Sequence, residues 1–522
     1  RLIMKHLKKH FGLLVIIGGY LLATLINLNS ASIWFDEAFS RHIIRFDFAK
    51  IWYFTSVDVH PPLYYFLLKI WTSVFGASDF AIRSMSVMFG ALAIAALYFL
   101  LKRLFNKKIA FFATLAAAFS PLFIRYSQEA RMYMLVAFLA ILAIRAFYEA
   151  FVASDIKKQK QTLWCRAYIA IICVGMWTQY LFALTVLGLW TFRVVEIYQS
   201  SKPKDRKFKK LAAKYFGEKW LSSHLWAAGF FLPWIPFFVT QAIQVKSGFW
   251  IPPVNFHTVP NFFTQLFLAR DGGMVSGWYS ILIYGLLIFT VWAAIKNARA
   301  GKFKKPLSML VLTSVGAIAI LYLASLPPFS SIFVNRYLIA SLIVINALIA
   351  ILIYLTFNDK KHRRVAILAA VTLVSLQLTG IVNVYETKAG DNITRQVIEQ
   401  AKYEMKAGEP IITEANDKNG WIFYEAVQYS TNENPVYFLD SSADYHIGSM
   451  RMLEDDDTFK IKDLAEFSRQ HETVWLLARP KDKKQKPLLK SWQLEKEILI
   501  DGPVSSKPLY SMQKYSVKSN LK

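Results

Sequence analysis

The sequence is poor in the residues and motifs that mark several classes of soluble protein. It has two cysteines, Cys165 and Cys173, in 522 residues. Eight residues apart on one helix, they lie roughly 12 Å apart, which is too far for a disulfide. We therefore expect both to be inert core residues. The absence of a P-loop, of Gly-x-Gly-x-x-Gly after a strand and of Gly-x-Ser-x-Gly removes support for nucleotide-binding and serine-hydrolase chemistry.

Acidic residues are scarce in the first three quarters of the chain. Residues 1–383 contain 13 Asp and Glu against 41 Lys and Arg, whereas residues 384–522 contain 22 against 20. The formal net charge of +26 therefore comes from short basic loops between apolar blocks. Basic loops of this kind are typical of the cytoplasmic side of membrane proteins. The charge pattern thus indicates the lipid bilayer as a partner and argues against nucleic acid.

Apolar blocks of about 16 to 26 residues recur along residues 1–383, close to the length needed to cross a bilayer. The N-terminal basic stretch leads into an apolar run that continues to about Asn29 with no small-residue cleavage site, so we expect a retained first span. The eleven expected spans are 11–30, 80–101, 109–124, 132–150, 165–179, 181–199, 223–240, 278–295, 306–325, 337–356 and 365–383.

The segment 61–76 is ambiguous, because it is apolar but short, begins with two prolines and contains Lys69. If it does not cross, all six basic clusters of the chain fall on one side; if it crosses, the first cluster opposes the other five. We therefore place it as a juxtamembrane or re-entrant helix on the outer face. This predicts a multi-pass protein of the bacterial cytoplasmic (inner) membrane, with a cytoplasmic N-terminus and an extracytoplasmic C-terminus.

The chain is expected to form two domains. Residues 1–383 would be an all-α transmembrane module with about 11 helices, in which residues 31–79 form a first extracytoplasmic loop with juxtamembrane helices. Residues 384–522 would be a soluble extracytoplasmic α/β domain with a mostly parallel sheet. The strands expected there are 410–413, 436–440 and 473–478, alternating with helical patterns at 392–406 and 461–470. The acidic run 455–457 and the Lys-rich run 481–490 are interpreted as solvated surface segments.

The first outer loop carries the acidic residues that point to chemistry. Asp36 and Glu37 follow the first span almost directly, among aromatic residues. A carboxylate just above a bilayer is costly to keep unless it is used, and it could act as a general base; the alternative is a solvated loop charge or a helix cap. Asp58 and His60, fixed by Pro61-Pro62, could position a substrate or bind a divalent cation, or simply begin a helix.

Several arginines lie at the outer ends of the expected spans, contrary to the usual excess of Lys and Arg on the cytoplasmic side. A guanidinium group suits a phosphate, because its planar fork binds two oxygens at once. The alternative is snorkelling, in which an arginine near a helix end reaches the lipid headgroups. Several together favour a lipid substrate that bears a phosphate or pyrophosphate. The residues are Arg83, Arg125, Arg131, Arg270 and Arg336.

These strings together resemble those of bacterial GT-C glycosyltransferases, and more narrowly the group related to protein O-mannosyltransferases and lipid A aminoarabinose transferases. The resemblance covers about residues 1–380. The matching strings are Phe35-Asp36-Glu37-Ala38, Asp58-Val59-His60-Pro61-Pro62-Leu63-Tyr64-Tyr65, Ile82-Arg83, Tyr126-Ser127-Gln128-Glu129-Ala130-Arg131 and Asn335-Arg336-Tyr337.

The resemblance implies transfer of a sugar, with inversion, from a polyprenyl-phosphate donor to an extracytoplasmic acceptor: a cell-envelope glycan, a glycolipid or a protein. Asp36 would be the general base and Glu37 would help to hold the acceptor. The donor phosphate would be bound by Arg83, Arg131 and Arg336. The substrate cavity would be lined by Asp58, His60, Tyr64, Tyr126, Gln128 and Glu129.

Two departures from the family pattern matter. His60 stands where the aminoarabinose transferases carry a lysine, so the contact with the donor phosphate and any metal requirement differ. No cofactor is certain; a divalent cation held by Asp58 and His60 stays open. The extra luminal module of the protein mannosyltransferases is missing, which does not favour a protein acceptor.

Two other classes of function remain as alternatives. A transporter or lipid flippase would place ionisable residues near the middle of the bilayer, whereas those of this chain fall mainly at span ends. A membrane scaffold whose C-terminal domain binds cell-wall polymer would need no convergence of Asp36 with arginines.

Overall fold

A computed structural model gives the fold, and it describes residues 2–247, 251–270, 277–301, 303–390, 393–414, 420–442, 448–478, 487–501 and 508–517. The chain forms two compact units. The helical unit comprises Arg1–Ile26, His60–Tyr64 and Arg83–Val384. The loop–sheet unit comprises Asn27–Val59, Tyr65–Ile82 and Tyr385–Lys522.

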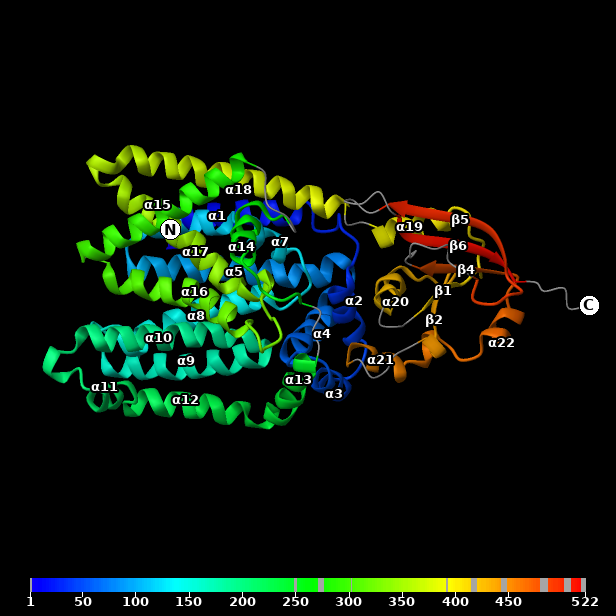
Figure 1. Cartoon of the computed structure of the whole chain (residues 1–522), viewed down its shortest axis with the longest axis horizontal. Coiled ribbons are helices and arrows are strands. Elements are labelled where there is room, and N and C mark those ends of the chain that lie inside the picture. Colours follow the sequence, from blue (N-terminus) through cyan, green and yellow to red (C-terminus); the bar gives the residue numbers. More distant parts are fainter. Residues whose placement is uncertain are drawn as a thin grey trace, which may run out of the picture. The chain divides into compact units, whose positions relative to one another are not determined.

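Eight helical segments in the described parts of the chain are long and apolar enough to cross a membrane. Each coincides with one of the expected spans, so the prediction of a polytopic all-α membrane fold is confirmed. They are α5 (Asp79–Leu104), α8 with η1 (Tyr133–Phe147 and Tyr148–Val152), η2 with α10 (Tyr180–Phe182 and Ala183–Ser200), α12 with η4 and α13 (Glu218–Phe231, Leu232–Trp234 and Ile235–Ser247), α15 (Trp278–Ala300), α16 (Lys304–Ala324), η5 with α17 (Asn335–Leu338 and Ile339–Phe357) and η6 with α18 (Lys360–His362 and Arg363–Gly390) (Figure 1).

The other three expected spans are helical but depart from a simple apolar crossing. The apolar part of α1 (Leu2–Leu25) is His10–Leu25, which is shorter than a full span. Helices α6 (Lys107–Ala118) and α7 (Pro121–Ser127) form a pair bent by 63°, and α9 (Lys158–Thr178) begins in basic sequence. Within the described residues, length and composition therefore give eight spans, or nine if the bent pair is one span.

The bend between α6 and α7 is stabilised by buried amides from neighbouring helices. A bend leaves backbone groups without helical partners, which hydrocarbon cannot satisfy. The Gln377 side chain of α18 donates to the Ala116 carbonyl at 2.8 Å and to the Asn346 side chain at 3.2 Å. Asn346 of α17 in turn donates to the Ser120 hydroxyl at 3.1 Å. The bend is thus a supported feature of the helical unit.

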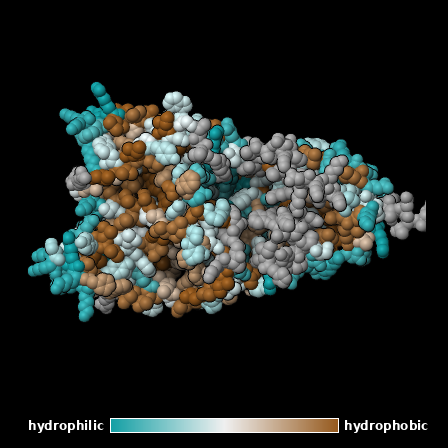
Figure 2. All heavy atoms as spheres, viewed as in Figure 1, coloured by the Kyte–Doolittle hydropathy of each residue, from teal (hydrophilic) through white to brown (hydrophobic). Residues whose placement is uncertain are grey.

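The basic loops lie at one end of the helical unit. Figure 2 shows hydrophilic residues gathered at the end where α11 (Phe208–Tyr215) lies, and hydrophobic residues along the sides. Ion pairs and one ring contact join these loops to one another: Arg103 with Glu149, Lys296 with Asp359, Lys305 with Glu196 and Phe105 with Phe303. This arrangement is the one that the charge bias requires. The side of the membrane on which these loops lie stays a prediction.

The loop–sheet unit contains a six-stranded mixed sheet with the order β3-β2-β1-β4-β6-β5. The parallel strands are β1 (Ile411–Glu414), β2 (Val436–Leu439), β3 (Lys460–Ile461) and β4 (Thr473–Ala478). Expected strands coincide with β1, β2 and β4, and α19 (Ile393–Lys402) and α22 (Leu464–Arg469) fall in the expected helical patterns. The expected α/β domain is therefore confirmed. The antiparallel hairpin of β5 (Gln493–Asp501) and β6 (Pro508–Ser516) was not predicted.

The same unit includes three short helices of the first loop: α2 (Phe35–Ile43), α3 (Phe48–Val57) and most of α4 (Leu63–Phe75). Phe35 and Phe39 of α2 contact the Tyr424 ring, with centroids 5.9 and 6.4 Å away. Helix α4 has 13 residues, about 20 Å at 1.5 Å per residue, which is short of the hydrocarbon thickness of about 30 Å. Its placement as a juxtamembrane helix stays a prediction.

One interpretation of the acidic run 455–457 was wrong. Asp456 is only 7% exposed, and its carboxylate lies 3.3 Å from His42 Nε2 of α2. Asp455 and Asp457 are solvated as expected, with 48% and 68% of their side chains exposed. The Lys-rich run 481–490 lies largely outside the described residues.

Candidate functional site

The acidic pair occupies the first turn of α2. The helix begins after Trp34, whose carbonyl accepts the Glu37 amide at 3.0 Å, and the Ser40 hydroxyl donates to the Asp36 carbonyl at 2.8 Å. Carboxylates at a helix N-terminus are stabilised by the helix dipole. The Glu37 side chain is buried, whereas Asp36 is half-buried. Asp36 is thus the more accessible carboxylate of the pair.

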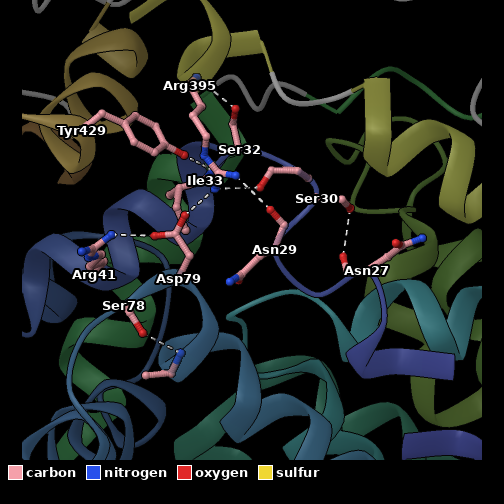
Figure 3. A network of polar contacts seen from close by, with 12 residues as sticks. Asn27, Asn29, Ser30, Ser32, Ile33, Arg41, Ser78, Asp79, Arg395 and Tyr429 are labelled. Carbon is pink, nitrogen blue, oxygen red and sulfur yellow. Dashed lines mark hydrogen bonds and ion pairs between the residues drawn. The ribbon is translucent and has the colours of Figure 1, made fainter. Parts of the chain in front are cut away.

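A polar network holds the two ends of α2 (Figure 3). Asp79 accepts from Arg41 at 2.9 Å with one oxygen and from Arg395 of α19 at 2.7 Å with the other. Arg395 also donates to the Asn29 carbonyl at 2.9 Å, and its backbone amide donates to the Ser32 hydroxyl at 3.1 Å. The network therefore fixes both the chain that enters α2 and the last turn of that helix.

Tyr429 adds a further fixed point ahead of α2. Its hydroxyl accepts the Ile33 amide at 2.8 Å, and Arg395 lies over its ring, 5.5 Å from the centroid. Burial raises the pKa of Tyr429, which keeps the phenol protonated at neutral pH. Tyr429 and Arg395, both distant in sequence, thus hold Asn29, Ser32 and Ile33 in the segment that leads into the acidic pair.

His42 and Asp456 form a second contact between α2 and the C-terminal region. Burial lowers the pKa of His42, despite its contact with Asp456, so its imidazole is neutral at neutral pH. Burial alone would raise the pKa of Asp456; hydrogen bonds from His42 and the Thr458 amide outweigh it and lower that pKa to about 2. A neutral imidazole can still donate one N–H to the carboxylate.

Two of the predicted phosphate-binding arginines lie in the helical unit, away from the basic loops. Arg83, near the start of α5, is fully buried, and Arg131, between α7 and α8, is 3% exposed. Ser86 lies three residues after Arg83, on the same side of α5, and its hydroxyl donates to the Arg131 carbonyl at 3.2 Å. The turn that carries Arg131 therefore packs on the side of α5 that carries Arg83.

His60 and the segment before Arg131 complete this region. His60 Nε2 lies 3.4 Å from a terminal nitrogen of Arg131. The Gln128 amide donates to the Thr24 carbonyl of α1 at 2.9 Å, and Glu129 lies 3.9 Å from Arg125. The structure thus brings together predicted residues from the proline string, α5 and the turn after α7, and α1 contributes the Thr24 carbonyl. The neighbouring residues Tyr64 and Tyr126 are also buried.

Arg336 enters the helical unit from another direction. It lies in η5, beside Asn335, whose side chain donates to Gln265 of α14 (Thr258–Leu268). Helix α14 packs against α7, and both lie so close to Gly380 of α18 that a methyl group there would collide with the Phe267 carbonyl and with Pro121. Arg270, after α14, donates to Asn383 of α18 at 3.4 Å.

The predicted residues are divided between the two units. Asp36, Glu37 and Asp58 belong to the loop–sheet unit, and His60 and the arginines belong to the helical unit. No cluster of three or more metal-binding side chains occurs within the described residues. The cationic Arg131 next to His60 also makes the imidazole a poor ligand for a metal ion. The metal hypothesis for Asp58 and His60 gains no support.

Sequence reasoning missed the residues that position α2, namely Asp79, Arg395, Tyr429 and Asp456. In the sequence, Asp79 is an ordinary acidic residue in the first turn of a helix, and Arg395 is an ordinary polar residue of an amphipathic helix. Their pairing spans 316 residues, and no local pattern carries such a signal.

Comparisons with known proteins bear on the whole chain. Residues 59–213 match the family described as dolichyl-phosphate-mannose-protein mannosyltransferase. The fold is similar to that of ArnT from Cupriavidus metallidurans bound to undecaprenyl phosphate, with 12% identity, a TM-score of 0.59, and coverage of 96% of this chain and 98% of that one. Apo ArnT matches with 13% identity, the same TM-score, and coverage of 96% and 97%. No curated protein matches significantly.

These similarities confirm the resemblance to glycosyltransferases related to ArnT and the O-mannosyltransferases. The match to ArnT covers the loop–sheet unit as well as the helices, since it extends over almost the full length of both chains. The chain therefore has an ArnT-like fold that extends over both units.

Proposed function

We propose that the protein is an integral membrane glycosyltransferase that moves a sugar from a polyprenyl-phosphate donor to an extracytoplasmic acceptor, with inversion. The observation that carries the proposal is the ArnT-like fold over 96% of the chain, combined with the mannosyltransferase match over residues 59–213. ArnT itself has been crystallised with undecaprenyl phosphate, the lipid that such a donor releases. The acceptor would be a cell-envelope glycan, a glycolipid or a protein.

The proposed reaction is a single displacement. An acceptor hydroxyl attacks the anomeric carbon of the sugar and forms the new glycosidic bond, while the bond from that carbon to the phosphate oxygen breaks. The hydroxyl proton passes to the Asp36 carboxylate, and the electron pair leaves with the polyprenyl phosphate. Attack from the face opposite the phosphate inverts the configuration. Glu37, which follows Asp36 in the sequence and is buried, would help to hold the acceptor.

The arginines would stabilise the charge that develops on the leaving phosphate. Arg83 and Arg131 are buried, and a buried guanidinium interacts with a phosphate more strongly than one in water. His60 next to Arg131 can accept a hydrogen bond from it and orient its guanidinium plane. We assign Arg336 to the same role because it occupies the third arginine position of the family strings.

The active site would face the extracytoplasmic side. This assignment rests on the charge bias: the basic loops gather at one end of the helical unit, and Arg83 and Arg131 lie toward the other. A cysteine-labelling test with a membrane-impermeant thiol reagent would check it. Cysteines introduced at the exposed residues Lys210 and Tyr403 should be protected and labelled, respectively, in intact cells.

The test of function uses a gene deletion and a matched pair of variants. Mass spectrometry of envelope glycans and lipids should show loss of one sugar in the deletion strain and its return with the wild-type gene. Asp36→Asn should fail to restore it, since loss of a general base costs about 10²–10⁴-fold in rate. Asp47→Asn, which alters an exposed carboxylate that caps α3, serves as the control and should restore it.

Two results would contradict the proposal in different ways. Full restoration by Asp36→Asn would remove Asp36 as the base but leave the transferase. Loss of the envelope sugar in the deletion strain, with the lipid-linked sugar retained on the cytoplasmic side, would favour a flippase instead. The rate of sugar transfer can be measured with purified protein mixed with lipids extracted from the deletion strain, because those lipids contain the unused donor.

A further inference from the structure

A cavity of about 530 Å³ lies within the loop–sheet unit, apart from the residues assigned to sugar transfer. Its walls come from the end of α2, from α4 and from the segment 427–430. Three cationic side chains line it: Arg41, Arg45 and Lys69. The other polar lining residues are His42, Thr72, Ser73, Gln428 and Ser430, and none of the described lining residues is acidic.

The charge of this cavity is positive even after its neighbours are counted. Arg41 is paired with Asp79, which also binds Arg395, and Arg45 lies 4.0 Å from Asp456. Lys69 donates to a backbone carbonyl, that of Ile44, at 2.9 Å, which leaves its charge uncompensated. Four cations therefore face two carboxylates. The neutral imidazole of His42 adds no charge at neutral pH.

The cations are held in place before any ligand binds. The Arg41 guanidinium is fixed by Asp79 (Figure 3), and Arg45 lies over the Phe459 ring, 4.8 Å from its centroid. Lys69 is fixed by the Ile44 carbonyl and lies 5.9 Å from the centroid of Phe48. Side chains that are already ordered lose little entropy on binding, so the cavity is preorganised for an anion.

Helix α4 indicates where this anion comes from. Lys69, Thr72 and Ser73 lie three and four residues apart, so they share one face, which lines the cavity. Ile70, Val74 and Phe75 lie away from it and are 54%, 71% and 58% exposed. A short helix with an exposed apolar face and a polar face is typical of a helix that lies in the membrane interface. A cavity beside such a helix lies at the depth of the lipid headgroups.

We propose that this cavity binds the phosphate group of a lipid headgroup at the membrane surface. Two arginines and a lysine match the charge of a phosphate, and the Ser430 hydroxyl, which accepts the Val436 amide at 3.0 Å, can donate its hydrogen to a remaining phosphate oxygen. The volume exceeds that of a phosphate alone and accommodates the attached glycerol or sugar. This site differs from the proposed donor-phosphate site, whose arginines all belong to the helical unit, and it does not depend on the protein being a transferase.

The test measures thermal unfolding of the full-length protein in an uncharged detergent. The probes are dioctanoyl phosphatidic acid, dioctanoylglycerol and inorganic phosphate. Phosphatidic acid should raise the Tm of the wild type, and dioctanoylglycerol, which lacks the phosphate, should not. Arg45→Gln and Lys69→Met should each raise the half-maximal phosphatidic acid concentration about tenfold, the effect of one lost charge-assisted hydrogen bond.

Lys50→Gln is the matched control. Lys50 is as exposed as Arg45, at 46% against 45%, and likewise pairs with an aspartate of the run 455–457, but it lies outside the cavity. This variant should respond to phosphatidic acid as the wild type does. An equal response of Arg45→Gln, Lys69→Met and wild type would overturn the proposal. Stabilisation by inorganic phosphate at the same concentration as phosphatidic acid would overturn the lipid source and leave a phosphate site.

Discussion

Replacement of Asp79 by asparagine should weaken the attachment of α2 and lower the free energy of unfolding of the loop–sheet unit. The carboxylate binds Arg41 at 2.9 Å and Arg395 at 2.7 Å, one with each oxygen, and its side chain is only 16% exposed. Asparagine keeps the shape but removes the charge. It can accept from one arginine only, and its amide group is a donor that faces the other.

The magnitude follows from the two bonds lost or weakened. A hydrogen bond to a charged group contributes about 1.5–3 kcal/mol, and breaking a buried ion pair costs about 3–5 kcal/mol. Arg395 keeps its bond to the Asn29 carbonyl, so we expect a loss of about 3 kcal/mol. Because 1 kcal/mol shifts the Tm of a domain of 150–250 residues by about 2–4 °C, the Tm of this unit should fall by about 6–12 °C.

The assay is intrinsic tryptophan fluorescence during heating of the purified full-length protein. Asp457→Asn is the control, because Asp457 also binds two cations, Lys460 and Lys462, but its side chain is 68% exposed. Exposed ion pairs contribute little to stability because water and salt screen them, so this variant should have nearly the same Tm as the wild type. If Asp79→Asn has the same Tm as Asp457→Asn, the network in Figure 3 does not hold α2 and the reasoning fails.

Two further predictions concern His42 and Arg131. Burial lowers the pKa of His42 below its ordinary value of 6.5, so the unfolded chain binds more protons than the folded one below that pH. The Tm should therefore fall between pH 7 and pH 5, and His42→Gln should have a flatter profile; parallel profiles would contradict this. Arg131→Gln should lower the initial rate at limiting donor at least tenfold, and Arg131→Lys should not restore it, because lysine lacks the planar fork. Recovery with lysine would show that charge alone suffices.

Periodicity and charge in the sequence predict the helical unit well, because both signals are local. An apolar block long enough to cross a bilayer can be recognised from its own residues, whatever lies elsewhere in the chain. Eight such blocks form the expected helices. The bend between α6 and α7 was not predicted, although Ser120 and Pro121 mark it in the sequence. Its stability depends on Gln377 and Asn346, which come from helices more than 200 residues later.

The loop–sheet unit was harder to predict, because long-range pairs hold it together. The acidic pair could be recognised from its own string, and β1, β2 and β4 from short apolar runs. The attachment of the first loop to the C-terminal sheet was not predicted, since it depends on the pairing of Asp79 with Arg395 and of His42 with Asp456. The hairpin of β5 and β6 has charged residues along β5, which obscure the alternation that marks a strand.

The exposed fraction of the side chain distinguishes the basic residues that indicate membrane topology from the arginines that could bind a substrate. A snorkelling arginine keeps its guanidinium in water or among the headgroups. Arg83 is fully buried and Arg131 is 3% exposed, whereas Lys210 and Lys305 in the basic loops are each 58% exposed. Snorkelling therefore does not explain Arg83 and Arg131. Their burial agrees with the proposed contact to the donor phosphate, because a guanidinium group outside bulk water interacts with a phosphate more strongly than one in water.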